Sequence, residues 1–181
     1  THAELYPSGL YKMDFESMEM SQIFEGFAEM SVYAPNKSLL AVIKNIMDTR
    51  VIAVIEESGS LIHQIPLPIE AVENSYGINV EHISWHPDGT ELLISQKHVP
   101  EGCCVEKNLG GYLYRVPIDG RTPSKIDLPN EYPSMAEWSP DGSKILFIDR
   151  GNSETRGLHI FDLSAASVVK MPVTVYIHAA I

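Results

Sequence analysis

Two stretches of the chain repeat one order of polar and apolar positions. SWHPDGTELLIS (residues 84–95) and EWSPDGSKILFI (137–148) each place an aromatic residue before Pro-Asp-Gly, then a polar pair and an apolar run. Proline presets φ for a turn, aspartate bonds back to its own backbone, and glycine accepts a positive φ. The β-branched and aromatic residues that follow favour a strand. Each stretch therefore predicts a strand, a tight turn and a second strand.

The repeat has a regular spacing. The two motifs are anchored at Pro87 and Pro140, 53 residues apart (140 − 87 = 53). A degenerate third copy, at residues 30–43, is anchored at Pro35, 52 residues earlier (87 − 35 = 52). The aromatic residues two positions before the prolines are Tyr33, Trp85 and Trp138. A fixed period of this length is typical of folds built from stacked supersecondary units.

A second hairpin follows each copy. Apolar and polar residues alternate in it, which is the period of a strand rather than a helix. The predicted hairpins are Arg50–Leu67 turning at Ser58-Gly59, Gly111–Leu128 turning at Asp119-Gly120, and Gly157–Val173 turning near Ser164 to Ala166. Gly9–Phe24 supplies one more such hairpin without a preceding half. Its segment MDFESMEM also suits a short helix, but its place in the repeat favours strands.

Four short antiparallel strands in about fifty residues cannot bury both faces of their sheet alone, and such sheets stacked around an axis make a β-propeller. The sequence therefore predicts an all-β propeller of four-stranded antiparallel blades, with about three full blades plus half-blades. Residues 1–181 are expected to form one propeller domain or a propeller fragment. The expected units are 9–25 as a half-blade, 28–68, 80–129 and 133–173 as full blades, and 174–181 as a tail. Two arrangements are open, a closed four-bladed ring and part of a larger propeller, and the second is preferred.

The motif resembles the WD40-like repeat of TolB-type β-propellers. The residues that carry the resemblance are Trp85, Pro87, Asp88 and Gly89, then Trp138, Ser139, Pro140, Asp141 and Gly142, with strand positions Leu113, Tyr114, Val116, Ile160, Phe161, Asp162 and Leu163. Related repeats occur in the propellers of tricorn peptidase, of prolyl-oligopeptidase and dipeptidyl-peptidase relatives, and of oligogalacturonate lyases. The resemblance implies the fold and a structural role for the Pro-Asp-Gly turns. It says little about activity, because one fold serves many functions.

The sequence shows no catalytic constellation. A Gly-x-Ser-x-Gly elbow, a phosphate-binding loop and a GxGxxG fingerprint are all absent. We therefore expect a non-enzymatic, protein- or peptide-binding scaffold without a cofactor. The first alternative is the accessory propeller of a serine peptidase whose catalytic domain lies outside this chain. The second is a metal-dependent lyase similar to the oligogalacturonate lyases.

The histidines are the basis of the lyase alternative, since oligogalacturonate lyases use a histidine-ligated metal. His82 and His86 flank Trp85, but no His-Glu-x-x-His motif is present. The adjacent Cys103 and Cys104 fit no zinc-ligand spacing and are better explained as free thiols in a loop. The sequence therefore predicts no metal site.

The longest irregular stretch predicted is Gln96–Gly111, between the second and third strands of its blade. Insertions of this kind lie on one face of a propeller and often carry binding function. The candidate recognition surface is Lys97, His98, Glu101, Lys107 and Asn108. A tolerated surface loop is the simpler explanation.

Charge and hydropathy limit the classes of partner that the protein is expected to bind. Lys plus Arg number 13 and Asp plus Glu 24, for a net charge of −11. Such a surface repels phosphate backbones, so nucleic acid is excluded and a cationic protein or peptide is favoured. No apolar run is long enough to span a bilayer, so membrane insertion is not expected. An open propeller would also leave strand edges unpaired, and because such edges can pair with another chain, a homo-oligomer is expected.

The compartment is predicted only through the resemblance. Likeness to TolB favours an extracytoplasmic location, periplasmic or secreted. The chain begins at Thr1 without an initiator methionine and shows no signal-peptide pattern, and either a processed or an excised chain would have these features.

Overall fold

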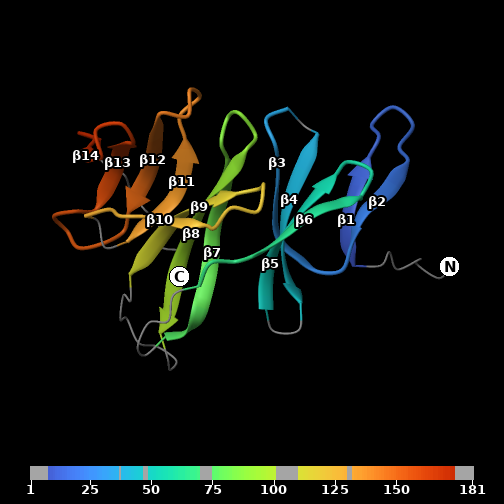
Figure 1. The fold of residues 1–181 in the computed structure, drawn as a ribbon, viewed down its shortest axis with the longest axis horizontal. Helices are drawn as coiled ribbons and strands as arrows, with labels where there is room; N and C mark the ends of the chain where they lie inside the picture. The colour runs from blue at the N-terminus through green and yellow to red at the C-terminus, as the bar shows by residue number, and fades with distance from the viewer. Residues whose placement is uncertain are drawn as a thin grey trace. The chain divides into compact units, whose positions relative to one another are not determined.

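The computed structural model describes residues 8–36, 38–46, 49–69, 75–100, 110–129 and 132–173. Within these ranges all regular secondary structure is β-strand, and no helix is present (Figure 1). The strands are β1 (Gly9–Met13), β2 (Met20–Glu25), β3 (Ala28–Tyr33), β4 (Leu39–Ile46), β5 (Thr49–Glu56), β6 (Leu61–Pro66), β7 (Ser75–Trp85), β8 (Glu91–Pro100), β9 (Gly111–Pro117), β10 (Ser124–Ile126), β11 (Pro133–Trp138), β12 (Lys144–Asp149), β13 (Gly157–Asp162) and β14 (Ser167–Lys170).

The chain divides into two compact units, Thr1–Leu67 and Pro68–Ile181. In the first unit β1 and β2 form a half-blade, and β3 to β6 form the first blade. In the second unit β7 to β10 form the second blade and β11 to β14 the third. Strands adjacent in sequence pair antiparallel within each sheet. The predicted all-β architecture of four-stranded blades with a half-blade is confirmed; the tail at 174–181 lies outside the described residues.

The predicted hairpin turns are present and their backbone shows why these residues form them. Each outer hairpin turns through one residue with positive φ: Met18 at 58°, Gly59 at 88°, Gly120 at 88° and Ala166 at 47°. The Pro-Asp-Gly turns do the same with Gly89 at 75° and Gly142 at 71°. MDFESMEM (residues 13–20) is the turn of the expected hairpin, with only Met13 and Met20 in strands, so the hairpin is present and the short helix is not.

A buried cluster joins the half-blade to the first blade. Its members are Ile23, Leu40, Val42, Ala53 and Ile55, with Leu10, Phe24 and Ala28 packed against it. The turn of β5 and β6 lies so close to β2 that a Cβ on Gly59 would stand 2.8 Å from the Ile23 carbonyl oxygen. Lys12 adds an ion pair to Glu57 at 2.5 Å.

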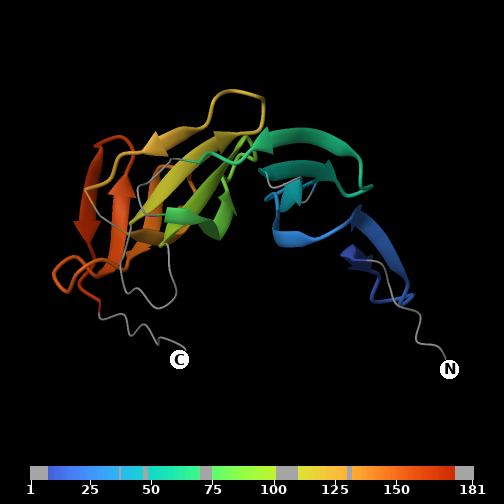
Figure 2. The ribbon, with the colours of Figure 1, turned by 90° about the horizontal axis from the view of Figure 1, so that it is seen from below.

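A second buried cluster joins the second and third blades. Its members are Leu93, Leu113, Ile126, Ala136, Trp138, Ile145 and Phe147. Strand β11 contacts β7, β8 and β9, so the first strand of the third blade lies along the second blade (Figure 2). Fully burying one large apolar side chain of this kind contributes about 1.5–3 kcal/mol, so the cluster stabilises the packing of the two blades. No helix in the described ranges is long and apolar enough to cross a membrane.

Candidate functional site

Strands β7 and β11, the first strands of two neighbouring blades, both carry an irregularity at equivalent places. In β7 the register shifts between Val80 and His82, and in β11 it shifts between Ser134 and Glu137. Bulges redirect side chains and are frequent next to functional sites. Met135, in the bulge of β11, has φ of 52° and is 42% exposed. We call the contact between these two strands and their flanking side chains the β7–β11 seam.

Glu137 is the centre of the upper part of the seam. Its carboxylate accepts a hydrogen bond from the Ser84 hydroxyl at 2.5 Å and contacts His82 Nε2 at 2.5 Å. The Glu137 side chain stays 52% exposed and that of His82 26%. Two groups from β7 thus fix a carboxylate of β11 that still faces solvent.

This Ser-Glu-His arrangement does not form a nucleophilic triad. In such a triad the histidine stands between serine and carboxylate and takes the serine proton. Here Glu137 lies between Ser84 and His82, and the Ser84 hydroxyl donates its hydrogen bond to the carboxylate. The Ser84 hydroxyl therefore has no histidine placed to take its proton, and the arrangement differs from that of a serine hydrolase.

Glu81 is the centre of the lower part of the seam. One carboxylate oxygen lies 3.4 Å from Lys97 Nζ, 3.6 Å from Arg150, and 3.4 Å from the Tyr132 hydroxyl that donates to it. The Glu81 side chain is only 9% exposed. Burial, followed by the negative charge of Glu81, raises the pKa of Tyr132 to about 12. This cluster ties both ends of the third blade's first hairpin to β7.

The repeated motifs themselves meet at this interface. The His86 ring lies edge-on to the Trp138 ring, with centroids 4.7 Å apart, and Arg115 approaches the same indole at 5.8 Å. His86 Nδ1 lies 2.7 Å from Asp88. Hydrogen bonds from Ser139 and Ser143 lower the pKa of Asp141 to about 2. Pro87-Asp88-Gly89 and Pro140-Asp141-Gly142 are therefore turns that also build the seam.

The predicted recognition surface is placed only in part. The stretch expected to be irregular from Gln96 is strand as far as Pro100, so Lys97 and His98 lie in β8 and not in a loop. Lys97 pairs with Glu81, whereas His98 is 5% exposed and packs edge-on to Tyr112 at 5.2 Å. Because its ring is buried, His98 is not part of an exposed recognition surface. Glu101, Lys107 and Asn108 lie outside the described residues, as do Cys103 and Cys104.

The two histidines considered as metal ligands have carboxylate partners instead. His82 bonds Glu137, and His86 bonds Asp88. Over the ranges that the structure describes, no three His, Cys, Asp or Glu side chains are grouped so as to hold a metal ion.

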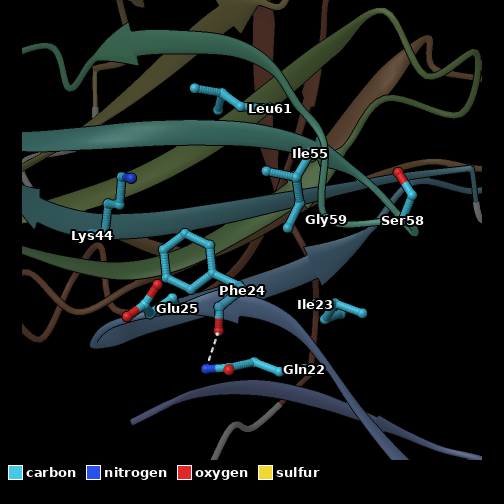
Figure 3. Close-up of a pocket in the computed structure, with 9 residues that line it drawn as sticks. All are labelled: Gln22, Ile23, Phe24, Glu25, Lys44, Ile55, Ser58, Gly59 and Leu61. Atoms are coloured by element: carbon cyan, nitrogen blue, oxygen red, sulfur yellow. Dashed lines mark hydrogen bonds between the residues drawn. The ribbon is translucent and has the colours of Figure 1, made fainter. Parts of the chain in front are cut away.

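A groove of about 430 Å³ lies within the first unit, between the half-blade and the first blade (Figure 3). Phe24, Ile55 and Leu61 supply its apolar lining, and the Lys44 ammonium lies 5.1 Å from the Phe24 ring centroid. Gln22 also lines the groove, and its side-chain amide donates to the Phe24 carbonyl oxygen at 3.3 Å. Its size suits a small molecule, but the polar groups that would fix an orientation do not converge.

Sequence reasoning missed Glu81 and Glu137 as site residues. A signal for Glu81 was present: it stands six residues before Pro87, as Glu29 stands six before Pro35. Glu29 also lies at a register shift, in β3, and pairs with Arg50 at 3.2 Å. An acidic residue in the bulge of the first strand is thus a repeated feature of the first two blades.

The fold is similar to solved structures at low sequence identity. TolB from Acinetobacter baumannii matches with a TM-score of 0.58 and 13% identity, over 87% of this chain and 36% of that one. A TolB-like protein from Agrobacterium tumefaciens matches with a TM-score of 0.59 and 15% identity, over 92% and 55%. Hydrazine synthase from Kuenenia stuttgartiensis matches with a TM-score of 0.59 and 16% identity, over 85% and 46%. No protein-family model and no curated protein sequence matches the chain.

The chain spans between 36% and 55% of the length of these three structures. Identities of 13% to 16% establish a common fold and leave activity open. Four-stranded antiparallel blades, Pro-Asp-Gly turns and apolar packing between blades all agree with that likeness. The chain has the β-propeller fold of TolB-like proteins.

Proposed function

We propose that the protein is a non-enzymatic scaffold that binds a cationic protein or peptide segment at the β7–β11 seam. The observation that carries this proposal is the Glu137 carboxylate, held by Ser84 and His82 and still 52% exposed. A carboxylate fixed before a partner arrives loses little conformational freedom on binding. Charge-assisted hydrogen bonds from lysine or arginine to such a group are among the stronger polar contacts.

The position of the seam supports a binding role. Blades of a propeller surround a central channel, and β7 and β11 each have a free side at the end of their sheet. Met135 adds an apolar contact beside Glu137, at a backbone conformation that a methionine rarely adopts. The net charge of −11 attracts a basic partner from a distance.

Fluorescence polarisation with two labelled probes tests this function. One probe is an extended peptide alternating lysine and leucine, and the other replaces each lysine with glutamate. We expect the basic probe alone to bind, with an affinity that falls as salt rises. Glu137→Gln should weaken binding about three- to tenfold, which corresponds to losing one charged contact.

Glu154→Gln is the matched control, because Glu154 is an exposed carboxylate of the same unit away from the seam. It should leave the affinity unchanged. Equal binding of both probes, or equal losses in the two variants, would contradict the proposal.

A further inference from the structure

Two cationic side chains in the lower part of the β7–β11 seam share one carboxylate oxygen. Lys97 Nζ lies 3.4 Å and Arg150 Nη1 lies 3.6 Å from Glu81 Oε1. The sum of these two distances, 7.0 Å, is therefore the largest separation that the two nitrogen atoms can have. Lys97 lies in β8 and Arg150 directly follows β12, so the second and third blades bring the two cations together. We call this pair the Lys97–Arg150 site.

The site carries more positive charge than Glu81 can balance. Two cations share one carboxylate, which leaves an excess of one positive charge. The Tyr132 hydroxyl donates to the same carboxylate at 3.4 Å, and its pKa of about 12 keeps it neutral at neutral pH. Tyr132 therefore supplies no compensating negative charge. A partly buried charge without a partner lowers stability, so the excess favours a ligand that carries a negative charge.

The hydrogen-bonding capacity of the two cations is also unmet. Their contacts to Glu81 are longer than the about 2.7–2.9 Å of a charge-assisted hydrogen bond. Arg150 Nε is buried, and the described part of the chain provides no hydrogen-bond partner for it. Glu81 Oε2 is likewise buried without a partner there, so this carboxylate does not meet the guanidinium with both of its oxygens. Because buried donors normally have partners, we expect an acceptor from outside the described residues to complete the site.

The site is open to solvent on one side. The side chains of Lys97 and Arg150 are each 35% exposed, whereas that of Glu81 is 9% exposed. A ligand can therefore reach both cations while Glu81 holds them from the buried side. Donors that are held in place before binding lose little conformational freedom when the ligand arrives.

We propose that the Lys97–Arg150 site binds a carboxylate group. Two charge-assisted hydrogen bonds of about 2.7–2.9 Å, one to each carboxylate oxygen, can bridge two nitrogen atoms that are at most 7.0 Å apart. One carboxylate carries one negative charge, which equals the excess at the site. A phosphate group at neutral pH carries about 1.5 to 2 negative charges and would overcompensate it. The carboxylate belongs to a small organic acid or to a peptide.

Only the peptide source rests on the proposed function. Glu81 and His82 are adjacent in β7, and they serve the lower and the upper part of the seam. A bound segment would then place a basic side chain on Glu137 and a carboxylate on the Lys97–Arg150 site. The seam would select segments that carry both signs of charge, and the order of the charges would fix the direction of the segment.

Titration with sodium acetate tests the site on the full 181-residue chain, followed by NMR of the arginine Nε–H groups. The Arg150 signal is the one that Arg150→Gln removes. It should shift saturably with acetate, and sodium chloride at the same ionic strength should not reproduce the shift. Lys97→Gln should raise the dissociation constant of acetate about tenfold or more. Arg121→Gln is the matched control, because it removes an exposed cation that pairs with Asp119 in the same unit, and it should leave the constant unchanged.

Glu81→Gln should change acetate binding in the opposite direction. Removing this carboxylate raises the local positive charge, so acetate should bind more tightly even though the fold is less stable. Thermal unfolding verifies that each variant is folded at the temperature of the titration. The proposal is overturned by the absence of a saturable shift, by an equal shift with chloride, or by weaker binding in Glu81→Gln. Tighter binding of inorganic phosphate than of acetate overturns it too, since the occupant would then be a phosphate.

Three versions of the lysine–leucine probe separate the two sources. One ends in an amide, one in a free carboxylate, and one is amidated with a single added glutamate. A single carboxylate is used because the net charge of −11 repels a peptide with many. Tighter binding of either carboxylate version, lost in Lys97→Gln, identifies a peptide source. Equal binding of all three, while acetate still binds, identifies a small acid. If acetate binds and no probe does, the proposed function fails and the carboxylate site stands.

Discussion

The His86 imidazole lies edge-on to the Trp138 indole, with ring centroids 4.7 Å apart and planes at 82°. Each residue belongs to one copy of the repeated motif, so the two copies meet directly across the blade interface. The Gly142 turn closes over the same imidazole. The repeat therefore supplies more than a turn in each blade, because one motif forms the packing surface for the next.

Gly142→Ala should destabilise the protein more than Gly89→Ala. Both glycines have positive φ, 71° and 75°, so each substitution costs about 1–2 kcal/mol in backbone conformation. A Cβ at position 142 would also stand 2.2 Å from His86 Nε2, whereas nothing lies within 4 Å of one at position 89. We expect a further loss of about 1–3 kcal/mol from that overlap. Urea denaturation measures both values; equal losses would show that His86 moves aside freely.

Much of this fold can be predicted from the sequence, because the signals that define its hairpins come from residues close together in the chain. The Pro-Asp-Gly turns and the alternation in segments such as Gly111–Pro117 depend on residues near each other in the chain. These signals place the hairpins, and the repeat favours a hairpin over a helix around residues 13–20.

The site was much less predictable, because its contacts join distant residues. Glu137 meets His82 across 55 positions, and Tyr132 meets Glu81 across 51. Whether a strand continues past Gln96 depends on pairing with β7, which local composition does not encode. For this reason the sequence predicts His98 in a loop, whereas the structure buries its ring in β8.

Ser95→Ala should show how much one hydrogen bond between the second and third blades contributes to the free energy of unfolding. The Ser95 hydroxyl is fully buried and accepts the Ala136 amide at 3.0 Å. Its removal leaves that amide without an acceptor, at about 1–3 kcal/mol of unfolding free energy. Ser167→Ala, at an exposed position, should stay within about 0.5 kcal/mol. Hydrogen exchange at the Ala136 amide should accelerate only in the first variant, and unchanged exchange there would refute the role.

Asp141→Asn should lower stability at neutral pH and have no effect in strong acid. Hydrogen bonds to Ser139 and Ser143 hold the pKa of Asp141 at about 2, below its ordinary 3.8. A carboxyl with a depressed folded-state pKa stabilises the fold above its unfolded pKa, and the contribution is lost as pH falls through the folded value. The difference between wild type and variant should therefore shrink from pH 4 to pH 2. Thermal unfolding across this window measures it; a difference as large at pH 2 as at pH 4 would assign the loss to something other than ionisation.

Glu81→Gln should destabilise the second unit by about 1–3 kcal/mol. The change leaves Lys97 and Arg150 without their buried carboxylate, although both cations are 35% exposed and water compensates them in part. Glu57→Gln is a suitable control, since its ion pair with Lys12 is about half exposed and its loss should change the stability little. Comparable losses in the two variants would mean that the Glu81 cluster is no stronger than a surface pair.

Ionisation of Tyr132 should lower the stability of the folded protein at alkaline pH, and Tyr132→Phe should reduce this loss. Burial and the Glu81 charge raise the pKa of Tyr132 from 10.0 to about 12 in the folded state. A group whose folded-state pKa is raised contributes stability that is complete below its unfolded pKa and is lost as pH rises through the folded value. Wild-type stability should therefore fall between pH 10 and pH 12, and the phenylalanine variant should lose less over the same interval. Glu81→Gln should move the hydroxyl's titration toward lower pH, because it removes the second cause of the shift and keeps the first. Difference absorbance between each protein and its Tyr132→Phe counterpart isolates this hydroxyl from the other tyrosines. A midpoint near 10 in the wild type would show that the hydroxyl is solvated and that the Glu81 cluster is open.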